Sequence, residues 1–510
     1  MEKSPEKSSE KNSERSSERS SEGDSKKGSE KKERILSSPF APELRGVHWT
    51  WFLRSTADGA TPQCSANSVS APWENAALAV AIPKPSMRIA FAMGLRYERR
   101  PADVNAVSRI AMGKGKQNLE GVERMRIDSL EIFLLGIPWK TERRSEGSEG
   151  NEPDTGRLET VLVRLESGGV SGWGEASPGR TPCTTSEWAG GVFACAAEYL
   201  GPTIVGRSFT NSEDLAKTFA RVHGNAYAKA AFDLAWWDCL AKQKKVPLPT
   251  LLGTVRQTLT LGAVFDQVPD SSYQRAMDVH IARIEAAVAA GYSRLGLKIR
   301  PGWDVQMVSS VRREFGSMLI HGDLEGALSM GYSELLYRFD DFFMKMLEQP
   351  LAASDLVSSA MLQNNIRTRI CLDESIQSVL DAQIAVDLRS GRCINLKPQR
   401  VGGLTPALEI LKHAESHQTD CWVGATPSTA IGARFNLTLA AKTAWDYPTD
   451  DFDGESLLET DVAAGPERFR DETREGSPLC AKLWTEPGIG IEPDPDILQR
   501  YTIHHVTLPA

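Results

Sequence analysis

The chain has 510 residues, of which 41% are hydrophobic and 25% charged, and it carries a formal net charge of −8. This composition excludes a chain that is disordered throughout, and the acidic excess argues against nucleic acid or an anionic membrane as the main partner. No apolar, uncharged stretch reaches the about 18 residues of a transmembrane helix. The eight cysteines form no CxxC pair, which favours reduced thiols and a cytoplasmic location over a disulfide framework.

The first 124 residues differ in composition from the rest of the chain. Residues 1–34 are mostly Ser, Glu, Lys and Arg, and we expect a disordered tail because this segment has little apolar surface to bury. Residues 35–124 show no sustained period, and no fold is assigned to this extension. An alternative is that the real protein opens near Met125.

Regular patterns begin at Met125. The segments 126–139, 158–169 and 170–176 alternate between apolar and polar residues and are predicted to be strands. Two segments with helical character follow, 186–200 and 226–245. Three strands followed by helices predict an α+β unit.

From Leu259 onward, short apolar runs alternate with helix-like segments. The runs are 259–265, 294–299, 317–323, 342–350, 369–375, 393–398 and 420–425. Repeated strand–helix units predict parallel strands with right-handed crossovers, and a series this long favours an α/β barrel. The alternative is a doubly wound sheet with a nucleotide site, but neither GxGxxG nor GxxxxGK[ST] follows any of these runs.

A charged residue closes each of five successive runs. These residues are Lys298, Asp323, Glu348, Asp373 and Lys397, separated by 25, 25, 25 and 24 positions. In a barrel they would share the C-terminal rim, where active sites of this architecture lie. Three neighbouring carboxylates would repel one another unless a hard cation bound them, so we predict a metal site for Mg²⁺, with Mn²⁺ as a chemical alternative.

The lysines on either side of the three carboxylates indicate the chemistry. An amine beside a bound cation has a lowered pKa and can act as a base, while the metal stabilises an enediolate. We therefore predict removal of a proton α to a carboxylate, followed by elimination or reprotonation. Any one of these residues taken alone could be a solvated or capping side chain. Five charged residues in this order and at this spacing favour the metal site instead. Glu374 is expected on the opposite face of its strand, against a helix.

Several motifs together resemble the enolase superfamily, in particular the o-succinylbenzoate synthase and N-succinylamino acid racemase group of its muconate-lactonizing branch. They are LKIRPGWD (297–304), LEQPL (347–351), CLDES (371–375), INLKPQRVGGLTPAL (394–408) and EPGIGIEP (486–493), with GWGEA and AKAAFDLAWWD earlier in the chain. The resemblance covers about residues 125–495. It implies an α/β fold: a (β/α)7β TIM-type barrel over residues 258–445, and an α+β capping domain formed by residues 125–257 and 446–510.

The resemblance also assigns roles to the strand-end residues. Asp323, Glu348 and Asp373 would be the metal ligands. Lys298 would remove the α-proton of a cyclohexadiene carboxylate (abbreviated SHCHC) and then protonate the departing hydroxyl, while Lys397 stabilises the enediolate. This is the syn dehydration of an o-succinylbenzoate synthase, a step in menaquinone biosynthesis. The alternatives are an N-succinylamino acid racemase that uses both lysines as bases, a cycloisomerase or dipeptide epimerase, and a non-catalytic binding protein.

Three positions depart from the family pattern. Gly296 replaces the first lysine of Lys-x-Lys, Glu325 replaces an asparagine, and Ser428 replaces an acidic residue. The loops expected to close over the substrate lie near 141–157 and 176–186. We expect a small carboxylate as the partner, with no nucleic acid and no membrane, and leave a homo-oligomer open.

Overall fold

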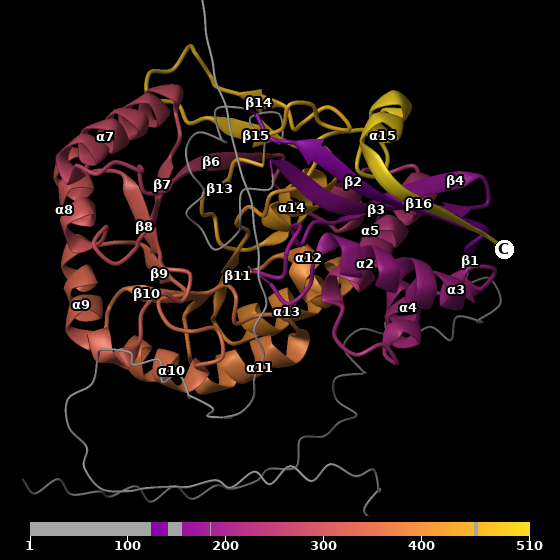
Figure 1. Ribbon diagram of the computed structural model, residues 1–510, viewed down its shortest axis with the longest axis horizontal. Coiled ribbons are helices and arrows are strands. Elements are labelled where there is room, and N and C mark those ends of the chain that lie inside the picture. Colours follow the sequence, from indigo (N-terminus) through magenta and orange to yellow (C-terminus); the bar gives the residue numbers. More distant parts are fainter. Residues whose placement is uncertain (1–123, 141–155, 184, 255, 453–456) are drawn as a thin grey trace, which may run out of the picture. The chain divides into compact units, whose positions relative to one another are not determined.

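The computed structural model describes residues 124–140, 156–183, 185–254, 256–452 and 457–510 (Figure 1). The predicted tail, residues 1–34, lies outside the described residues. So does the extension up to residue 123 and most of the loop expected near 141–157. Among the described residues, no helix is both long and apolar enough to cross a membrane.

An antiparallel sheet of four strands follows the start of the described chain. Its strands are β2 (Ser129–Pro138), β3 (Arg157–Ser167), β4 (Val170–Ala176) and β16 (Thr502–Pro509), in the order β16-β2-β3-β4. Because β16 is the last strand of the chain, this sheet combines segments from both ends of the described region. A separate two-stranded antiparallel sheet is formed by β1 (Met125–Arg126) and β5 (Ser208–Phe209).

Helix α5 (Ala226–Gln243) packs directly against β4, and glycine makes this approach possible. A Cβ atom on Gly172 would lie 2.3 Å from the carbonyl oxygen of Ala235, and one on Gly174 would lie 2.1 Å from that of Ala231. Any larger residue would force the helix away from the strand. The other helices of this unit are α2 (Ala189–Cys195), the π-helix η2 (Ala196–Leu200), α3 (Gly201–Ile204), α4 (Ser212–Phe219) and α6 (Leu248–Leu251).

The second part of the described chain is a barrel of parallel strands surrounded by helices (Figure 1). The strands are β6 (Thr258–Phe265), β7 (Arg294–Lys298), β8 (Leu319–Asp323), β9 (Met346–Glu348), β10 (Arg369–Leu372), β11 (Cys393–Asn395), β12 (Asp420–Trp422) and β13 (Thr449–Asp450). Strands β6 to β12 pair in chain order, and β13 pairs with β6. The predicted (β/α)7β architecture with an α+β cap is confirmed.

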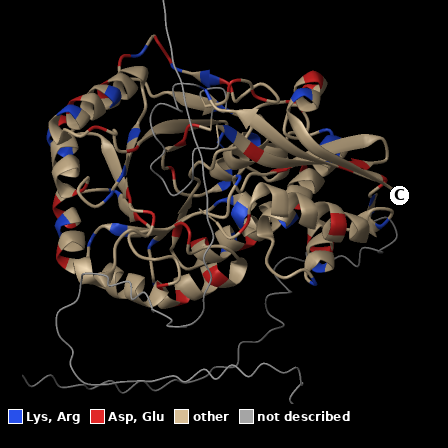
Figure 2. Ribbon diagram, viewed as in Figure 1, with Lys and Arg blue, Asp and Glu red and all other residues tan. Residues whose placement is uncertain are grey.

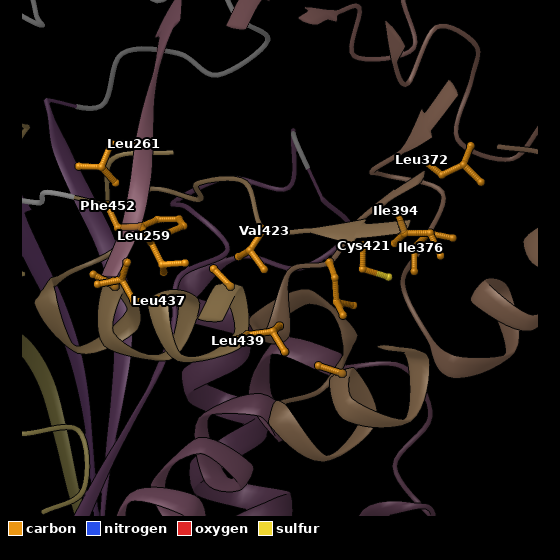
Figure 3. Close-up of a cluster of buried hydrophobic side chains, with 14 of the residues drawn as sticks. Leu259, Leu261, Leu372, Ile376, Ile394, Cys421, Val423, Leu437, Leu439 and Phe452 are labelled. Atoms are coloured by element: carbon orange, nitrogen blue, oxygen red, sulfur yellow. The ribbon is translucent and has the colours of Figure 1, made fainter. Parts of the chain in front are cut away.

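The helices between these strands form an outer layer around the barrel (Figure 1). They are α7 (Tyr273–Ala290), α8 (Val305–Glu314), η3 (Met330–Tyr332), α9 (Ser333–Arg338), η4 (Phe339–Phe342), α10 (Leu356–Asn365), α11 (Val379–Leu388), α12 (Pro398–Val401), α13 (Leu404–Ser416) and α14 (Ala430–Lys442). Figure 3 shows Leu259, Leu437 and Phe452 among the buried side chains that fill the space between β6 and α14. Burial of each such leucine contributes about 1.5–3 kcal/mol.

The segment after residue 445 contributes strands to both the barrel and the capping domain. Strand β13 and strand β15 (Cys480–Lys482) pair with β6 of the barrel, β14 (Arg468–Phe469) pairs with β15, and only then does α15 (Pro495–Tyr501) lead to β16 of the cap. The sequence-based division at residue 445 therefore passes between β12 and β13. A two-residue strand is too short to leave an alternating pattern in the sequence.

Two buried carboxylates of the cap bind the amino ends of barrel helices. Glu175 accepts hydrogen bonds from the backbone N–H groups of Thr429 (3.0 Å) and Gly432 (2.7 Å), at the start of α14. Asp233 accepts from the backbone N–H of Thr405 (3.0 Å) and from its hydroxyl, at the start of α13. Carboxylates at helix amino termini satisfy free N–H donors and complement the helix dipole, so these contacts fix the cap on the barrel.

Burial raises the pKa of Asp233 to about 7, although the hydrogen bonds from Thr405 oppose this shift. Because an unfolded aspartate has a pKa of about 3.9, the folded protein holds this proton more tightly. This contribution to stability is therefore complete below pH ~4 and is lost as the pH rises through ~7. We expect Asp233→Asn to flatten that part of the pH dependence, measured by urea unfolding from pH 4 to 8. Asp278→Asn, at an exposed position, is the control; equal pH slopes in wild type and Asp233→Asn would contradict the assignment.

Candidate active site

The five charged residues predicted at strand ends lie next to one another at the carboxyl end of the barrel. Lys298, Asp323 and Glu348 are the last residues of β7, β8 and β9, and the register pairs Lys298 with Asp323 and Asp323 with Glu348. Asp373 directly follows β10, and Lys397 follows β11 by two positions. Figure 2 shows acidic and basic residues mixed within the ring of barrel helices.

Lys298 is held by two carboxylates. Its Nζ donates to Oδ2 of Asp323 at 2.6 Å and to Glu325, whose other oxygen accepts from Arg300 at 2.8 Å. Burial alone would lower the pKa of Lys298, but the charges of Asp323 and Glu325 raise it well above its ordinary value. In this arrangement Lys298 is protonated, so a base function requires that its carboxylate partners be neutralised by another cation.

Asp373 has two cationic partners. Lys397 Nζ donates to its Oδ2 at 2.7 Å, and Arg400 contacts the other carboxylate oxygen and donates to the main-chain carbonyl at 2.6 Å. Burial would raise the pKa of Asp373, but Arg400 and Lys397 lower it below its ordinary range. Asp373 is therefore ionised, as a metal ligand must be.

Of the three carboxylates, Glu348 is the one to which the described residues supply no lysine or arginine partner. It is 2% exposed, accepts from the side-chain amide of Asn395 at 2.7 Å, and lies 3.5 Å from Nε2 of His321. Burial, Arg294 and Lys298 lower the pKa of His321 well below its ordinary value, so this ring is neutral. Burial and the nearby Asp323 and Asp373 raise the pKa of Glu348 well above its ordinary value. A bound cation would remove this penalty.

The donor set at the rim fits a hard divalent cation. Asp323, Glu348 and Asp373 are all at least nine-tenths buried, and each offers carboxylate oxygens, the ligands that Mg²⁺ prefers. With Lys298 on Asp323 and Lys397 on Asp373, the three carboxylates are not all within 4.8 Å of one another. A shared metal would therefore compete with the two lysines for the same oxygens.

The absence of a side chain at Gly296 leaves space that the guanidinium of Arg294 occupies. A Cβ atom at this position would lie 2.6 Å from a guanidinium nitrogen of Arg294 and 3.2 Å from Nε2 of His321. Arg294 is fully buried and forms an ion pair with Asp450 of β13, the strand next to β6 in the barrel. A lysine at position 296 would therefore require the guanidinium of Arg294 to shift, and Arg294 already supplies a buried positive charge in the same region.

A cavity of about 420 Å³ lies beside the rim, between the barrel and the loop of the capping domain that contains Cys183 and Ser186. Cys183 and Ser186 line it from the cap, and Glu325, Gln349 and Glu374 line it from the barrel. Glu374 was expected against a helix; instead it borders this cavity because it lies in the loop after β10, where strand alternation no longer applies. Burial and the neighbouring Asp373 raise the pKa of Glu374 to about 7.

Three residues at the site were not singled out from the sequence. Asn395 connects Glu348 to the backbone N–H of Gly424 (2.8 Å), Arg400 binds Asp373, and the side-chain amide oxygen of Gln349 accepts from the backbone N–H of Asp373 (3.0 Å). A polar Asn395 within the apolar run CINLKP was the signal that could have identified it.

Comparison with protein families and curated proteins identifies relatives of the chain. Residues 154–253 match the mandelate racemase / muconate lactonizing enzyme N-terminal domain, and residues 280–497 match the enolase C-terminal domain-like family. The chain is 34% identical to o-succinylbenzoate synthase of Bacillus subtilis (strain 168), an alignment that covers 67% of this chain and 88% of that protein. It is 33% identical to N-succinylamino acid racemase of Thermus thermophilus, covering 66% and 89% respectively.

Solved structures show the same fold. A member of the enolase superfamily from Listeria innocua superposes with a TM-score of 0.68 at 28% identity, covering 76% of this chain and 99% of that one. Muconate lactonizing enzyme from Pseudomonas fluorescens superposes with a TM-score of 0.65 at 19% identity, covering 74% and 100%, which supports the fold alone.

Proposed function

The chain belongs to the mandelate racemase / muconate lactonizing enzyme group of the enolase superfamily, and we propose that within this group it is a metal-dependent o-succinylbenzoate synthase. The observation that carries the proposal is the set of three buried carboxylates between Lys298 and Lys397, in a chain 34% identical to an o-succinylbenzoate synthase. Enzymes of this superfamily use divalent metals, and we propose Asp323, Glu348 and Asp373 as the ligands of Mg²⁺.

The bound metal would hold the substrate carboxylate and stabilise the negative charge that develops when the α-carbon loses its proton. With Asp323 bound to the metal, Lys298 would release its own proton to solvent, and the neutral amine Nζ would then accept the α-proton. It would then deliver the proton to the departing hydroxyl, which leaves as water, so a single base serves both halves of the reaction. Lys397, on the far side of the carboxylates along the barrel, would stabilise the enediolate with its positive charge.

Glu325 and Arg300 would tune this step. Glu325 holds Lys298 through a second ion pair, and Arg300 in turn binds Glu325. In the family pattern this position is an asparagine, so Glu325 adds a negative charge that favours the protonated lysine. We propose that Arg300 offsets part of that charge and keeps Glu325 turned partly away from the metal ligands.

The proposal is tested by incubating the purified full chain with SHCHC and Mg²⁺. We expect conversion to o-succinylbenzoate, loss of turnover after treatment with EDTA, and recovery when Mg²⁺ is restored, because the enediolate forms only with a cation to stabilise it. Absence of product from a folded, metal-loaded sample would contradict the assignment.

A second candidate is racemisation of an N-succinylamino acid. Both lysines needed as opposite bases are present beside the carboxylates, and relatives that carry this name are about as similar to the chain as the synthases are. Racemisation requires Lys397 to accept or donate a proton, whereas dehydration requires only its charge. Burial and the neighbouring Arg400 would lower the pKa of Lys397, but the charge of Asp373 raises it above its ordinary value, so Lys397 also needs Asp373 to be neutralised before it can act as a base.

A further inference from the structure

Two barrel helices bring together a set of metal-binding side chains away from the rim. Asp387 lies near the end of α11, His413 lies in the last turn of α13, and His417 caps that helix. One ligand atom from each residue lies within 4.8 Å of the other two, and no other group of this kind occurs in the part of the chain that the structure describes. The carboxyl ends of the helices in a barrel lie opposite the carboxyl ends of the strands, so this cluster is separate from the catalytic rim.

The two histidines are arranged as ligands usually are. They are four positions apart on one helical face, with ring centroids 4.3 Å apart. Nδ1 of His417 lies 2.8 Å from the main-chain carbonyl oxygen of His413, and a proton donated to that carbonyl leaves the lone pair on Nε2. A carbonyl partner on the second ring nitrogen is the feature that orients metal-bound imidazoles in proteins.

An unsatisfied atom points to a ligand at the same place. Nε2 of His413 is buried and has no hydrogen-bond partner among the described residues, whereas buried polar atoms are nearly always bonded. The carboxylate of Asp387, on the neighbouring helix, is exposed and supplies the negative charge. A nitrogen of each imidazole and a carboxylate oxygen therefore lie close enough together to share one ion.

We propose that Asp387, His413 and His417 bind a divalent transition metal of the Zn²⁺ class and thereby clamp α11 to α13. Imidazole nitrogens select Zn²⁺ over Mg²⁺, because Mg²⁺ prefers oxygen ligands in a full octahedron. Three protein ligands leave one position of a tetrahedral Zn²⁺ for water. Since the ligands come from two helices, bound metal stabilises the folded barrel by mass action.

The test is calorimetric titration of the full chain with Zn²⁺ in excess Mg²⁺, compared with His417→Ala and Asp387→Asn. Both positions are exposed, so the variants should keep the wild-type circular dichroism spectrum. All proteins carry Cys183→Ser, because the exposed thiol of Cys183 is another Zn²⁺ ligand. His223→Ala removes an exposed histidine outside the cluster and is the matched control.

We expect wild type and His223→Ala to bind one more Zn²⁺ than His417→Ala, and Zn²⁺ to raise their unfolding temperature but not that of His417→Ala. The same difference should persist in a Glu348→Gln background, where the rim ligands are incomplete, which separates this site from the proposed active site. Equal Zn²⁺ stoichiometry and equal thermal shifts in wild type and His417→Ala would overturn the proposal.

Discussion

Replacement of Lys298 by alanine is expected to lower kcat for SHCHC by about 10²–10⁴-fold, the contribution of a positioned acid or base. The structure places its ammonium 2.6 Å from Asp323, at the edge of the proposed metal site. No other lysine borders Asp323 among the described residues, so the substrate's α-proton would lose its acceptor. Initial rates of o-succinylbenzoate formation measure the effect.

Two further readouts separate a lost base from a damaged site. Because Lys298 competes with a metal for Asp323, Lys298→Ala should bind Mg²⁺ at least as tightly as wild type in calorimetry. Lys412→Ala, an exposed lysine on α13, should keep wild-type kcat. Full activity in folded Lys298→Ala would show that a different group removes the proton.

Replacement of Glu348 by glutamine should abolish most Mg²⁺ binding. Loss of an outer-shell partner of a metal ligand already costs about 10–100-fold in affinity, and loss of a charged ligand should cost more. The metal-free protein should not be destabilised, because the change removes a buried carboxylate whose pKa is raised by burial, Asp323 and Asp373. Calorimetry with Mg²⁺ and urea unfolding in EDTA measure the two effects.

The informative result is a loss of Mg²⁺ affinity in Glu348→Gln without a loss of stability in the metal-free protein. Glu409→Gln, an exposed position on α13, should alter neither Mg²⁺ affinity nor stability. If Glu348→Gln kept wild-type Mg²⁺ affinity, Glu348 would not be a ligand. If it instead unfolded in EDTA, the hydrogen bond from Asn395 would have a structural role that outweighs the like-charge repulsion.

The sequence predicted the barrel and its rim because both rest on local, repeated patterns. Each apolar run predicts a strand. A charged residue at the carboxyl end of a buried strand is expected at the rim of the barrel. Lys298, Asp323 and Glu348 each end a strand, so their juxtaposition follows from strand order and register alone. The expectation was secure because parallel neighbours in chain order leave few alternative pairings.

Contacts between distant segments could not be read in this way. Glu175 binds the start of α14 from more than 250 residues away, and Asp233 binds Thr405 across 172 positions. No periodicity relates such partners, and each carboxylate alone appears as one polar residue in an apolar helix or strand. The position of Arg294 beside Gly296 could not be predicted for the same reason. Its partner Asp450 lies more than 150 residues later in the chain, and the two residues meet only in the folded barrel.

The loops at the rim were the least predictable part. Glu374 borders the cavity beside Glu325 because the chain has left β10 before it reaches this residue. Strand alternation, which the sequence expectation used, ends with the strand itself. Substrate preference depends on such loop residues, so the sequence identified the class of chemistry better than the substrate.

The most direct test of the proposed function is a side-by-side measurement of kcat/KM for SHCHC and for N-succinylamino acids, on the full chain saturated with Mg²⁺. We predict formation of o-succinylbenzoate with the larger kcat/KM, and loss of both reactions in Lys298→Ala. Racemisation of N-succinylamino acids without any dehydration of SHCHC would contradict it.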